Sequence, residues 1–305
     1  MSGRNQSGSA LLLALLVVAM VAALASSVIW RQQLWIADIE MQRERAVLRN
    51  LARSGADWAR AVLVEDARAS AIDYLGEPWA QRIPLTPVND GEIGGYIEDQ
   101  QGRWNINNLV RNGKTDPYQF AVLQRLLDSL GLPVELAFAL LDWIDGDNET
   151  SDGAGAEDGY YLSLPSPYRT ANAPLVHVDE LRLVRGFTPD VIDKLRPFVT
   201  ALPEFSAINV NTAPRTVLAA MQRIYSESDL DAVLSRRERL PYRDLADFRG
   251  TLQQSSFDIR DELLTTASQY FLATISAKYK DSFIELDCMI RRQAGRTELV
   301  WQRFP

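Results

Sequence analysis

The feature that most constrains this chain is an uninterrupted apolar run near its start. Residues Ala10 to Trp30 span 21 amino acids without a charge. As a helix this run would be about 30 Å long, which matches the hydrocarbon thickness of a bilayer. Arg4 precedes the run, although Arg31 follows closely, and positive charge before a span favours a cytoplasmic N-terminus. We therefore expect one membrane anchor, with everything after it outside the cytoplasm.

A cleavable signal peptide is the alternative interpretation of this run. Ala23-Leu24-Ala25 could form a small-x-small cleavage site. However, the apolar run continues past that site and merges into a helical pattern, with apolar residues three or four apart as far as Leu63. No Pro or Gly occurs between residues 9 and 54. We therefore predict one retained helix of about 45–55 residues, apolar all round at first and amphipathic later.

The composition indicates a globular part outside the membrane and excludes several classes of function. Hydrophobic residues make up 47% of the 305 residues, and 40 acidic residues outnumber 32 basic ones, giving a net charge of -8. Such a surface disfavours extended contact with nucleic acid or anionic lipid. The lone Cys288 and lone His177 exclude an internal disulfide and a conventional zinc site. We expect Cys288 to be a small buried residue on a strand, and His177 to lie in a loop or at a helix start.

A loop rich in acid and glycine is the strongest candidate for a binding site. No Lys or Arg occurs between Leu126 and Tyr168, and within that stretch seven carboxylates crowd into residues 142–158. They repel one another unless a cation neutralises them, and calcium takes about 6–8 oxygen ligands. We predict a structural calcium site of one or two ions. Its ligands should come from the following carboxylates: Asp142, Asp145, Asp147, Asp152, Glu157 and Asp158.

The acidic loop has three other interpretations besides a calcium site. The spacing of Asp145, Asp147 and Glu149 is similar to that of an EF-hand, but Thr150 stands where the turn needs Gly, and Ala156 where the loop needs Glu. We therefore exclude an EF-hand. A solvated acidic loop without metal is one alternative. A carboxylate pair that hydrolyses glycosides is another, and it would make the chain a periplasmic hydrolase.

The hydrophobic pattern predicts a mainly helical middle of the chain. A strand and turn are expected around Tyr96 and Trp104, after a proline-rich connection. A helix should begin at Pro117 and be closed by Gly131, and a second should cover residues 134–144.

Later segments are similar to the helix-hairpin-helix units of DNA-binding proteins. Within residues 178–199, Asp179 or its neighbour should cap a first helix, Gly186 should end it, and Pro189 should open the second. A basic group follows, interrupted by Glu238 and Asp244: Arg236, Arg237, Arg239 and Arg243. Because the whole chain is acidic and tethered, we favour an interaction domain. A membrane-tethered DNA-binding or DNA-uptake protein is the alternative.

From Gln269 onward the hydrophobic period changes to two. Apolar residues alternate with polar ones in three stretches: Ala273 to Ala277, Ile284 to Ile290, and Leu299 to Trp301. Turn residues separate the stretches, so we predict a three-stranded antiparallel meander covered by the amphipathic half of the first helix. The expected fold class is α+β: a long N-terminal helix on a small antiparallel sheet, with a large inserted all-α domain.

The start of the chain resembles the leader of type IV pilin-like proteins, because Gly8 directly precedes the apolar run. In that family, prepilin peptidase cuts after the glycine and leaves the helix attached. The resemblance implies cleavage between Gly8 and Ser9, and methylation of Ser9 would be a further mark of the family. Most members carry Glu at the fifth mature position, where it neutralises a neighbour's terminal amine inside an apolar bundle. Leu13 stands there and cannot do so, which favours a terminal position in a filament.

The chain as a whole resembles protein K of the type II (general) secretion pathway, a family of minor pseudopilins. The resemblance is carried by these segments: GSALLLALLVV, QGRWNINNL, DWIDGDNETSDGAGAEDGYY, SPYRTANAPL, ELRLVRG and INVNTAP. It implies a leader at 1–8, the anchor and first part of a pilin-like domain at 9–105, an inserted helical domain at 106–268 with a calcium loop at 142–158, and the meander at 269–305.

The same resemblance implies a non-enzymatic role, without nucleic acid or a small-molecule substrate. The subunit would sit at the tip of a periplasmic pseudopilus and help to initiate it for protein export. Its partners would be minor pseudopilins I and J, with pseudopilin H and the major pseudopilin as further neighbours. It would be anchored in the inner membrane of a Gram-negative bacterium by one span, with its head in the periplasm.

Overall fold

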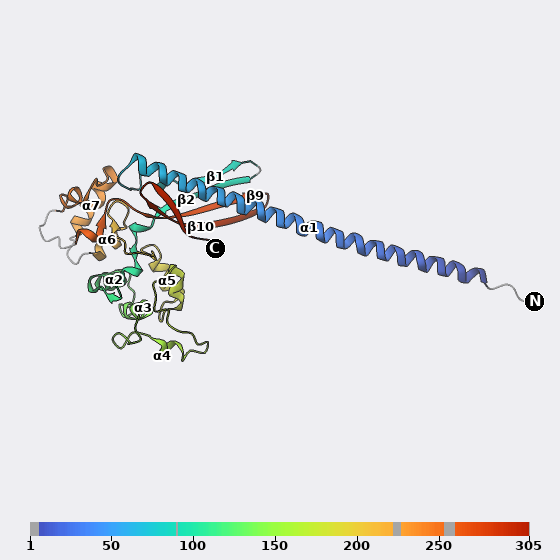
Figure 1. The fold of residues 1–305 in the computed structure, drawn as a ribbon, viewed down its shortest axis with the longest axis horizontal. Helices are drawn as coiled ribbons and strands as arrows, with labels where there is room; N and C mark the ends of the chain where they lie inside the picture. The colour runs from blue at the N-terminus through green and yellow to red at the C-terminus, as the bar shows by residue number, and fades with distance from the viewer. Residues whose placement is uncertain (1–5, 90, 222–226, 253–259, 305) are drawn as a thin grey trace, which may run out of the picture.

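The computed structural model describes the whole chain except residues 1–5, 90, 222–226, 253–259 and 305. One very long helix projects from a head that holds a five-stranded sheet and a group of short helices (Figure 1). The α-helices are α1 Gln6–Ala69, α2 Pro117–Ser129, α3 Leu136–Ile144, α4 Asp158–Tyr161, α5 Pro189–Leu195, α6 Arg215–Met221, α7 Glu227–Arg239 and α8 Leu245–Arg249. The 3-10 helices are η1 Pro78–Ala80, η2 Gln100–Gly102, η3 Ile106–Leu109, η4 Val178–Leu183 and η5 Asp261–Leu263.

Helix α1 is longer than the sequence predicts. It runs for 64 residues, and residues 9–43 are exposed on every side (Figure 1). Glycine normally weakens a helix interior, but Gly55 does not end this one. A Cβ at Gly55 would lie 2.6 Å from Ile275 Cγ2, so the glycine lets the helix approach the sheet closely. Residues 1–5 of the expected leader lie outside the described residues, and residues 6–8 belong to α1.

The sheet is antiparallel throughout, with strand order β1-β2-β9-β10-β11. Its last three strands form the predicted meander. The strand expected around Tyr96 is present, whereas Trp104 belongs to a separate short strand. The strands are β1 Ile83–Val88, β2 Gly91–Asp99, β3 Trp104–Asn105, β4 Val110–Arg111, β5 Lys114–Thr115, β6 Val199–Thr200, β7 Ile208–Asn209, β8 Leu264–Thr265, β9 Tyr270–Tyr279, β10 Ser282–Gln293 and β11 Arg296–Arg303.

The second half of α1 covers one face of this sheet, as predicted. Small and apolar side chains of α1 are buried there, namely Leu48, Ala52, Ala56, Ala59 and Leu63. They pack on inward-facing residues of the sheet, among them Ile275, Leu286, Cys288 and Ile290. Cys288 is fully buried on β10, as predicted, and this burial raises the pKa of its thiol to about 11. Helix and sheet therefore form a pilin-like unit.

The residues between β2 and β9 form a separate mass with its own hydrophobic core. It lies at the end of α1 farthest from the N-terminus (Figure 1). As predicted, α2 opens with Pro117, and Gly131 with a φ of +63° follows its end. Helix α3 begins at Leu136, two residues later than expected. Two-residue strands also pair inside this insertion, so it is helical but not purely so.

The expected helix–turn–helix around Gly186 takes a different form. Its first member, η4, is a 3-10 helix, and its cap is His177, whose Nδ1 accepts from Asp179 N–H at 3.0 Å. The His177 N–H in turn donates to Glu180 Oε1 at 2.9 Å, which completes a capping box. The expected cap, Asp179, instead forms ion pairs with Arg196 at 2.7 Å and Arg303 at 2.8 Å. Those arginines hold the pKa of Asp179 down to about 2, against the opposing effect of burial.

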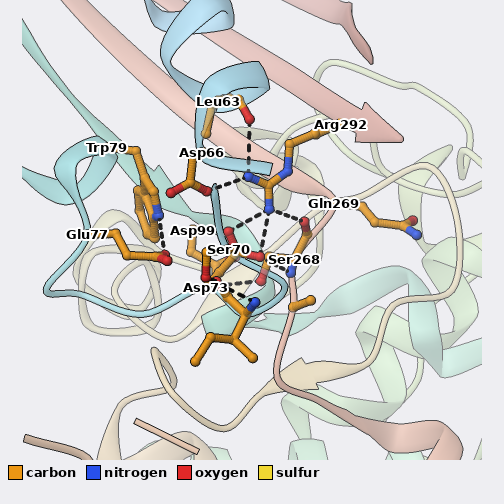
Figure 2. Close-up of polar contacts among 12 residues, drawn as sticks. Leu63, Asp66, Ser70, Asp73, Glu77, Trp79, Asp99, Ser268, Gln269 and Arg292 are labelled. Carbon is orange, nitrogen blue, oxygen red and sulfur yellow. Dashed lines mark hydrogen bonds and ion pairs between the residues drawn. The ribbon is translucent and has the colours of Figure 1, made fainter. Parts of the chain in front are cut away.

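Where the insertion joins the pilin-like unit, one arginine organises a buried polar junction (Figure 2). Arg292 on β10 lies 2.7 Å from Asp66 at the end of α1 and 2.5 Å from Asp73. Its guanidinium also donates to the carbonyl oxygens of Leu63 at 3.3 Å and Ser268 at 3.1 Å. The side chains of all three charged residues are less than a tenth exposed. The guanidinium therefore supplies positive charge that these carboxylates need.

Asp99, at the end of β2, is the second centre of this junction (Figure 2). Its Oδ2 accepts hydrogen bonds from Asn209 at 3.0 Å, Thr212 at 2.6 Å and Ser268 at 2.7 Å. Asn209 and Thr212 belong to the insertion, and Ser268 lies where the chain returns to the sheet. Burial raises the pKa of Asp99 despite these donors. The insertion is thus fixed to the sheet by a network of hydrogen bonds and not by a loose linker.

Candidate metal centre in the acidic loop

The acidic loop leaves the C-terminal end of α3 and ends at α4, on the outer part of the insertion (Figure 1). Asp142 is fully buried in the last turn of α3, and both its oxygens accept from Ser151 N–H, at 3.0 and 3.2 Å. A Cβ at Gly155 would overlap Asp142 Oδ2 and lie 2.6 Å from Ser151 O. Asp142 therefore fixes the path of the loop, and glycine is required where the loop passes it.

Three of the predicted ligands converge. Single ligand atoms of Asp145, Asp147 and Glu157 all lie within 4.8 Å of one another. Asp145 and Glu157 are 8% and 4% exposed, yet Asp145 Oδ1 and both carboxylate oxygens of Glu157 have no hydrogen-bond partner. Buried carboxylate oxygens are normally satisfied. Three orphaned, clustered oxygens are the donor set that a hard cation such as calcium prefers, so these residues fit the ion.

The electrostatics of this cluster point the same way. Burial, together with the charges of Asp147 and Asp142, raises the pKa of Asp145 to about 6. Burial and the charges of Asp142 and Asp145 raise the pKa of Glu157 to about 7. Burial also raises the pKa of Asp142. Without a cation, the ionised cluster is therefore costly near neutral pH, and a divalent ion would remove that cost.

Besides Asp142, two further predicted ligands lie outside this group of three. Asp158 accepts from the N–H and the hydroxyl of Thr170, at 3.1 and 3.0 Å, and pairs with Arg169 at 3.3 Å. Asp152 is exposed, has a φ of +41° and accepts from Gly153 N–H at 2.9 Å. In these positions Asp158 closes the loop and Asp152 shapes a turn.

The structure adds residues that the carboxylate pattern does not reveal. Asn172 Nδ2 donates to Asp147 O at 3.0 Å, and Thr170 holds Asp158, so the segment around residue 170 closes the loop. Arg185 Nη1 donates to Gly155 O at 3.1 Å from the far side. Tyr161 packs edge-on against Trp143 beneath the loop. The unusual sequence SPYRTANAPL was the available signal for the closing segment.

The membrane-proximal residues singled out by the sequence lie on the free part of α1. The helix from Ser9 is long and apolar enough to span a membrane, with a mean hydropathy of 2.8 in its most apolar window and none of that window buried. Gly8 and Ser9 are helical, and Leu13 is exposed to its surroundings. Leu13 therefore presents an apolar surface at the position where the resemblance to type IV pilin-like proteins leads us to expect a carboxylate.

Comparisons with known proteins agree with this architecture. Two family profiles described as "Type II secretion system (T2SS), protein K" match residues 102–204 and 208–268. The chain is 37% identical to type II secretion system protein K of Pseudomonas aeruginosa over 281 residues, covering 88% of this chain and 83% of that one. It is 30% identical to the protein of the same name from Klebsiella pneumoniae, covering 98% and 96%.

A solved structure shows the same fold. A chain of the GspK-GspI-GspJ complex from the type 2 secretion system of enterotoxigenic Escherichia coli aligns with a TM-score of 0.76 and 25% identity, over 87% of this chain and 98% of that chain. The expected pilin-like α+β fold and the expected resemblance are both confirmed. This chain belongs to the type II secretion system protein K family, the minor pseudopilins with a long N-terminal helix and a large inserted domain.

Proposed function

We propose that this chain caps the tip of a periplasmic pseudopilus and helps to initiate it. The observation that carries the proposal is the position of the insertion, at the end of α1 farthest from the anchor (Figure 1). Pilin-like subunits stack along their long helices, so a bulky mass at that end would block the next subunit. Asp99 is bonded to Asn209 and Thr212 of the insertion, and Arg292 to the Ser268 carbonyl, so the insertion is held against the sheet at this end.

The anchor supports the same proposal. Subunits inside a filament need the carboxylate that neutralises a neighbour's amine, because an unpaired charge is costly in an apolar bundle. Leu13 lacks it. A terminal subunit has no neighbour above it, so the missing carboxylate costs nothing there. Cleavage between Gly8 and Ser9 would leave α1 in the inner membrane with the head in the periplasm.

The partners proposed for the tip are minor pseudopilins I and J. The structural relative was solved as a GspK-GspI-GspJ complex, and this chain matches one of its chains over most of its length. Pseudopilin H and the major pseudopilin would then follow below. The protein K family is a structural component of the secretion system, and the proposal involves no catalytic step.

We further propose that the acidic loop holds calcium as a structural ion. Asp145, Asp147 and Glu157 would be ligands, and Asp142 would orient the loop around them. Asp152 and Asp158 stay as predicted ligands if the loop tightens on binding. The ion would supply the positive charge that the loop lacks, and so order the outer part of the insertion.

The decisive experiment is to locate the full-length chain in assembled pseudopili. The chain, with a small electron-dense label on its insertion, would be expressed with pseudopilins I and J and the major pseudopilin of one secretion system. We expect one label at one end of each filament, and mass spectrometry showing Ser9 as the first residue. Labels along the filament shaft, or a mature chain that begins after Ala25, would refute the proposal.

DNA binding was the alternative function, and the arginine group argues against it. Arg236 pairs with Asp247 at 2.6 Å, and Arg237 Nη1 donates to the carbonyl oxygens of Val210 at 3.0 Å and Ala213 at 2.7 Å. These arginines hold the insertion together and do not form a free phosphate-binding row. We expect no salt-dependent binding of duplex DNA by the full-length chain.

A further inference from the structure

The two edges of the sheet are protected to very different degrees. A free strand edge presents unpaired N–H and C=O groups and invites another chain to pair with it, and proline is a common guard. β1, at one edge, contains Pro84 and Pro87. β11, at the other edge, has eight residues and no proline. One edge is therefore blocked against strand addition, and the other is left available.

The register of β10 and β11 shows which backbone groups face outward. Arg292 N–H donates to Gln269 O at 2.6 Å, on the side away from β11. Thr297 is the register partner of Arg292, so its own backbone groups point away from β10. In agreement, Arg60 on α1 donates to Thr297 O at 3.1 Å from outside the sheet. Backbone groups two residues apart on a strand point to the same side, so those of Leu299 also point away from β10.

A row of arginines on α1 runs beside this edge. Arg49, Arg53 and Arg60 are spaced by four and seven residues, which places them within about 40° on one helix face. Because Arg60 contacts β11, that face is the one next to the open edge. Arg49 and Arg53 are exposed, and neither has an ion-pair partner among the described residues. Arg60 pairs with Asp57 at 3.2 Å, so Arg49 and Arg53 are the unpaired part of a basic strip on a chain whose net charge is -8.

The geometry selects one kind of occupant. Arg49 and Arg53 are about 6 Å apart along the helix axis, and alternate side chains of a strand are about 6.6 Å apart. A strand added to β11 could thus place two acidic side chains of one face opposite the two arginines. Lipid headgroups do not fit, because Arg49 lies about 28 Å beyond Trp30, the last residue of the apolar run.

We propose that β11 is a docking edge for an extended acidic segment of a partner protein, which adds to the sheet as a sixth strand. Backbone hydrogen bonds to the Thr297 N–H and to both backbone groups of Leu299 hold the segment, because Thr297 O already accepts from Arg60. Arg49 and Arg53 select its acidic residues. The exposed Leu299 side chain, 41% accessible, offers an apolar contact on the same strand. The inference does not depend on the position of the chain in a filament.

The test uses the full-length chain in detergent micelles and a fluorescent ten-residue peptide of alternating Val and Glu. A matched peptide carries Lys in place of each Glu. We expect the acidic peptide to bind at least about tenfold more tightly than the Lys peptide, with an affinity that falls as salt rises. Binding should slow hydrogen exchange in residues 297–301.

Two independent variants probe the two parts of the site. Leu299→Pro removes an outward N–H in the way that β1 already does, and Arg49→Glu with Arg53→Glu reverses the strip. Each should weaken acidic-peptide binding at least about tenfold while the circular dichroism spectrum is kept. Arg43→Glu is the matched control, because Arg43 is exposed but lies about 100° from Arg60 around α1.

Several results would overturn the inference. Equal binding of the Lys peptide, or equal weakening by the Arg43 control, would remove the role of the arginine strip. Unchanged binding to a folded Leu299→Pro variant would remove strand addition. Self-association through β11 that excludes the peptide would show that the edge serves a second copy of this chain and not an acidic partner.

Discussion

Replacing Arg292 by Met should destabilise the sheet more than any other single charge removal in this head. Arg292 makes two buried ion pairs, to Asp66 at 2.7 Å and Asp73 at 2.5 Å. A hydrogen bond to a charged group contributes about 1.5–3 kcal/mol net, and removing one partner of a buried pair costs about 3–5 kcal/mol. Methionine keeps most of the side-chain volume, so the loss reports the charge. We expect a loss of about 3–5 kcal/mol at pH 7.

The loss should depend on pH in a defined direction. Even beside Arg292, burial raises the pKa of Asp66 from 3.8 to about 6. Without the guanidinium that pKa rises further, so the folded state binds an extra proton that the unfolded state releases. A raised carboxyl pKa gives stability that is lost as pH rises through the folded value. The difference in free energy of unfolding between the unmodified chain and Arg292→Met should therefore be smaller at pH 5 than at pH 7, by up to about 1.4 kcal/mol per pH unit.

The assay is urea unfolding of the full chain in detergent, followed by hydrogen exchange of peptides from β9 and β10. Peptides from α2 report the second core separately, because the two cores need not unfold together. Arg291→Met is the matched control: its partners Glu204 and Glu298 are more than half exposed, so it should cost less than about 1 kcal/mol. If Arg292→Met lowers the free energy of unfolding by less than about 1 kcal/mol, or by an amount that does not change with pH, the reasoning is refuted.

Three further predictions concern the loop and the anchor. Without calcium, the protein should lose stability as the pH rises from about 4.5 to 7, because Glu157 ionises through its raised pKa, and added calcium should restore that stability. Thermal melts with and without chelator test this. Glu157→Gln should abolish the effect of calcium on the melting temperature. Gly155→Ala should cost about 1–3 kcal/mol by overlapping Asp142, measurable in the same melts against Gly153→Ala, which meets nothing. Leu13→Glu should leave the chain at filament tips, because the insertion would still block the next subunit; labels along the filament shafts would contradict this steric argument.

The fold could be predicted where one local pattern dominates. The uncharged run fixes the first half of α1, and the period-two alternation fixes β9 to β11, because each pattern suits only one kind of packing. β1 was missed because Pro84 and Pro87 indicate a connection, whereas an edge strand tolerates them. The expected length of 45–55 residues falls short of the 64 residues of α1, and the close approach that Gly55 permits depends on Ile275, a residue 220 positions later.

For the candidate metal centre, the sequence predicts the position of the loop but not which carboxylates come together, because that also depends on residues distant in the chain. Acidic composition located the loop, but only the fold brings Asp145, Asp147 and Glu157 together and sets them apart from Asp158, which holds Thr170. Burial leaves oxygens of Asp145 and Glu157 without partners, and the path of the loop depends on the segment around residue 170 that folds back over it. No count of carboxylates contains that information.

The alternation along β10 also contains a signal for the Arg292 junction. Ile284, Leu286, Cys288 and Ile290 alternate toward α1, and Arg292 occupies the next inward position. A charge on the buried face of a strand is costly unless partners surround it, so its presence predicts buried acids nearby. Those acids are Asp66 and Asp73, supplied by the far end of α1 and the segment after it. The same guanidinium that neutralises them binds Ser268, at the return from the insertion, so one side chain couples the helix, the sheet and the inserted domain.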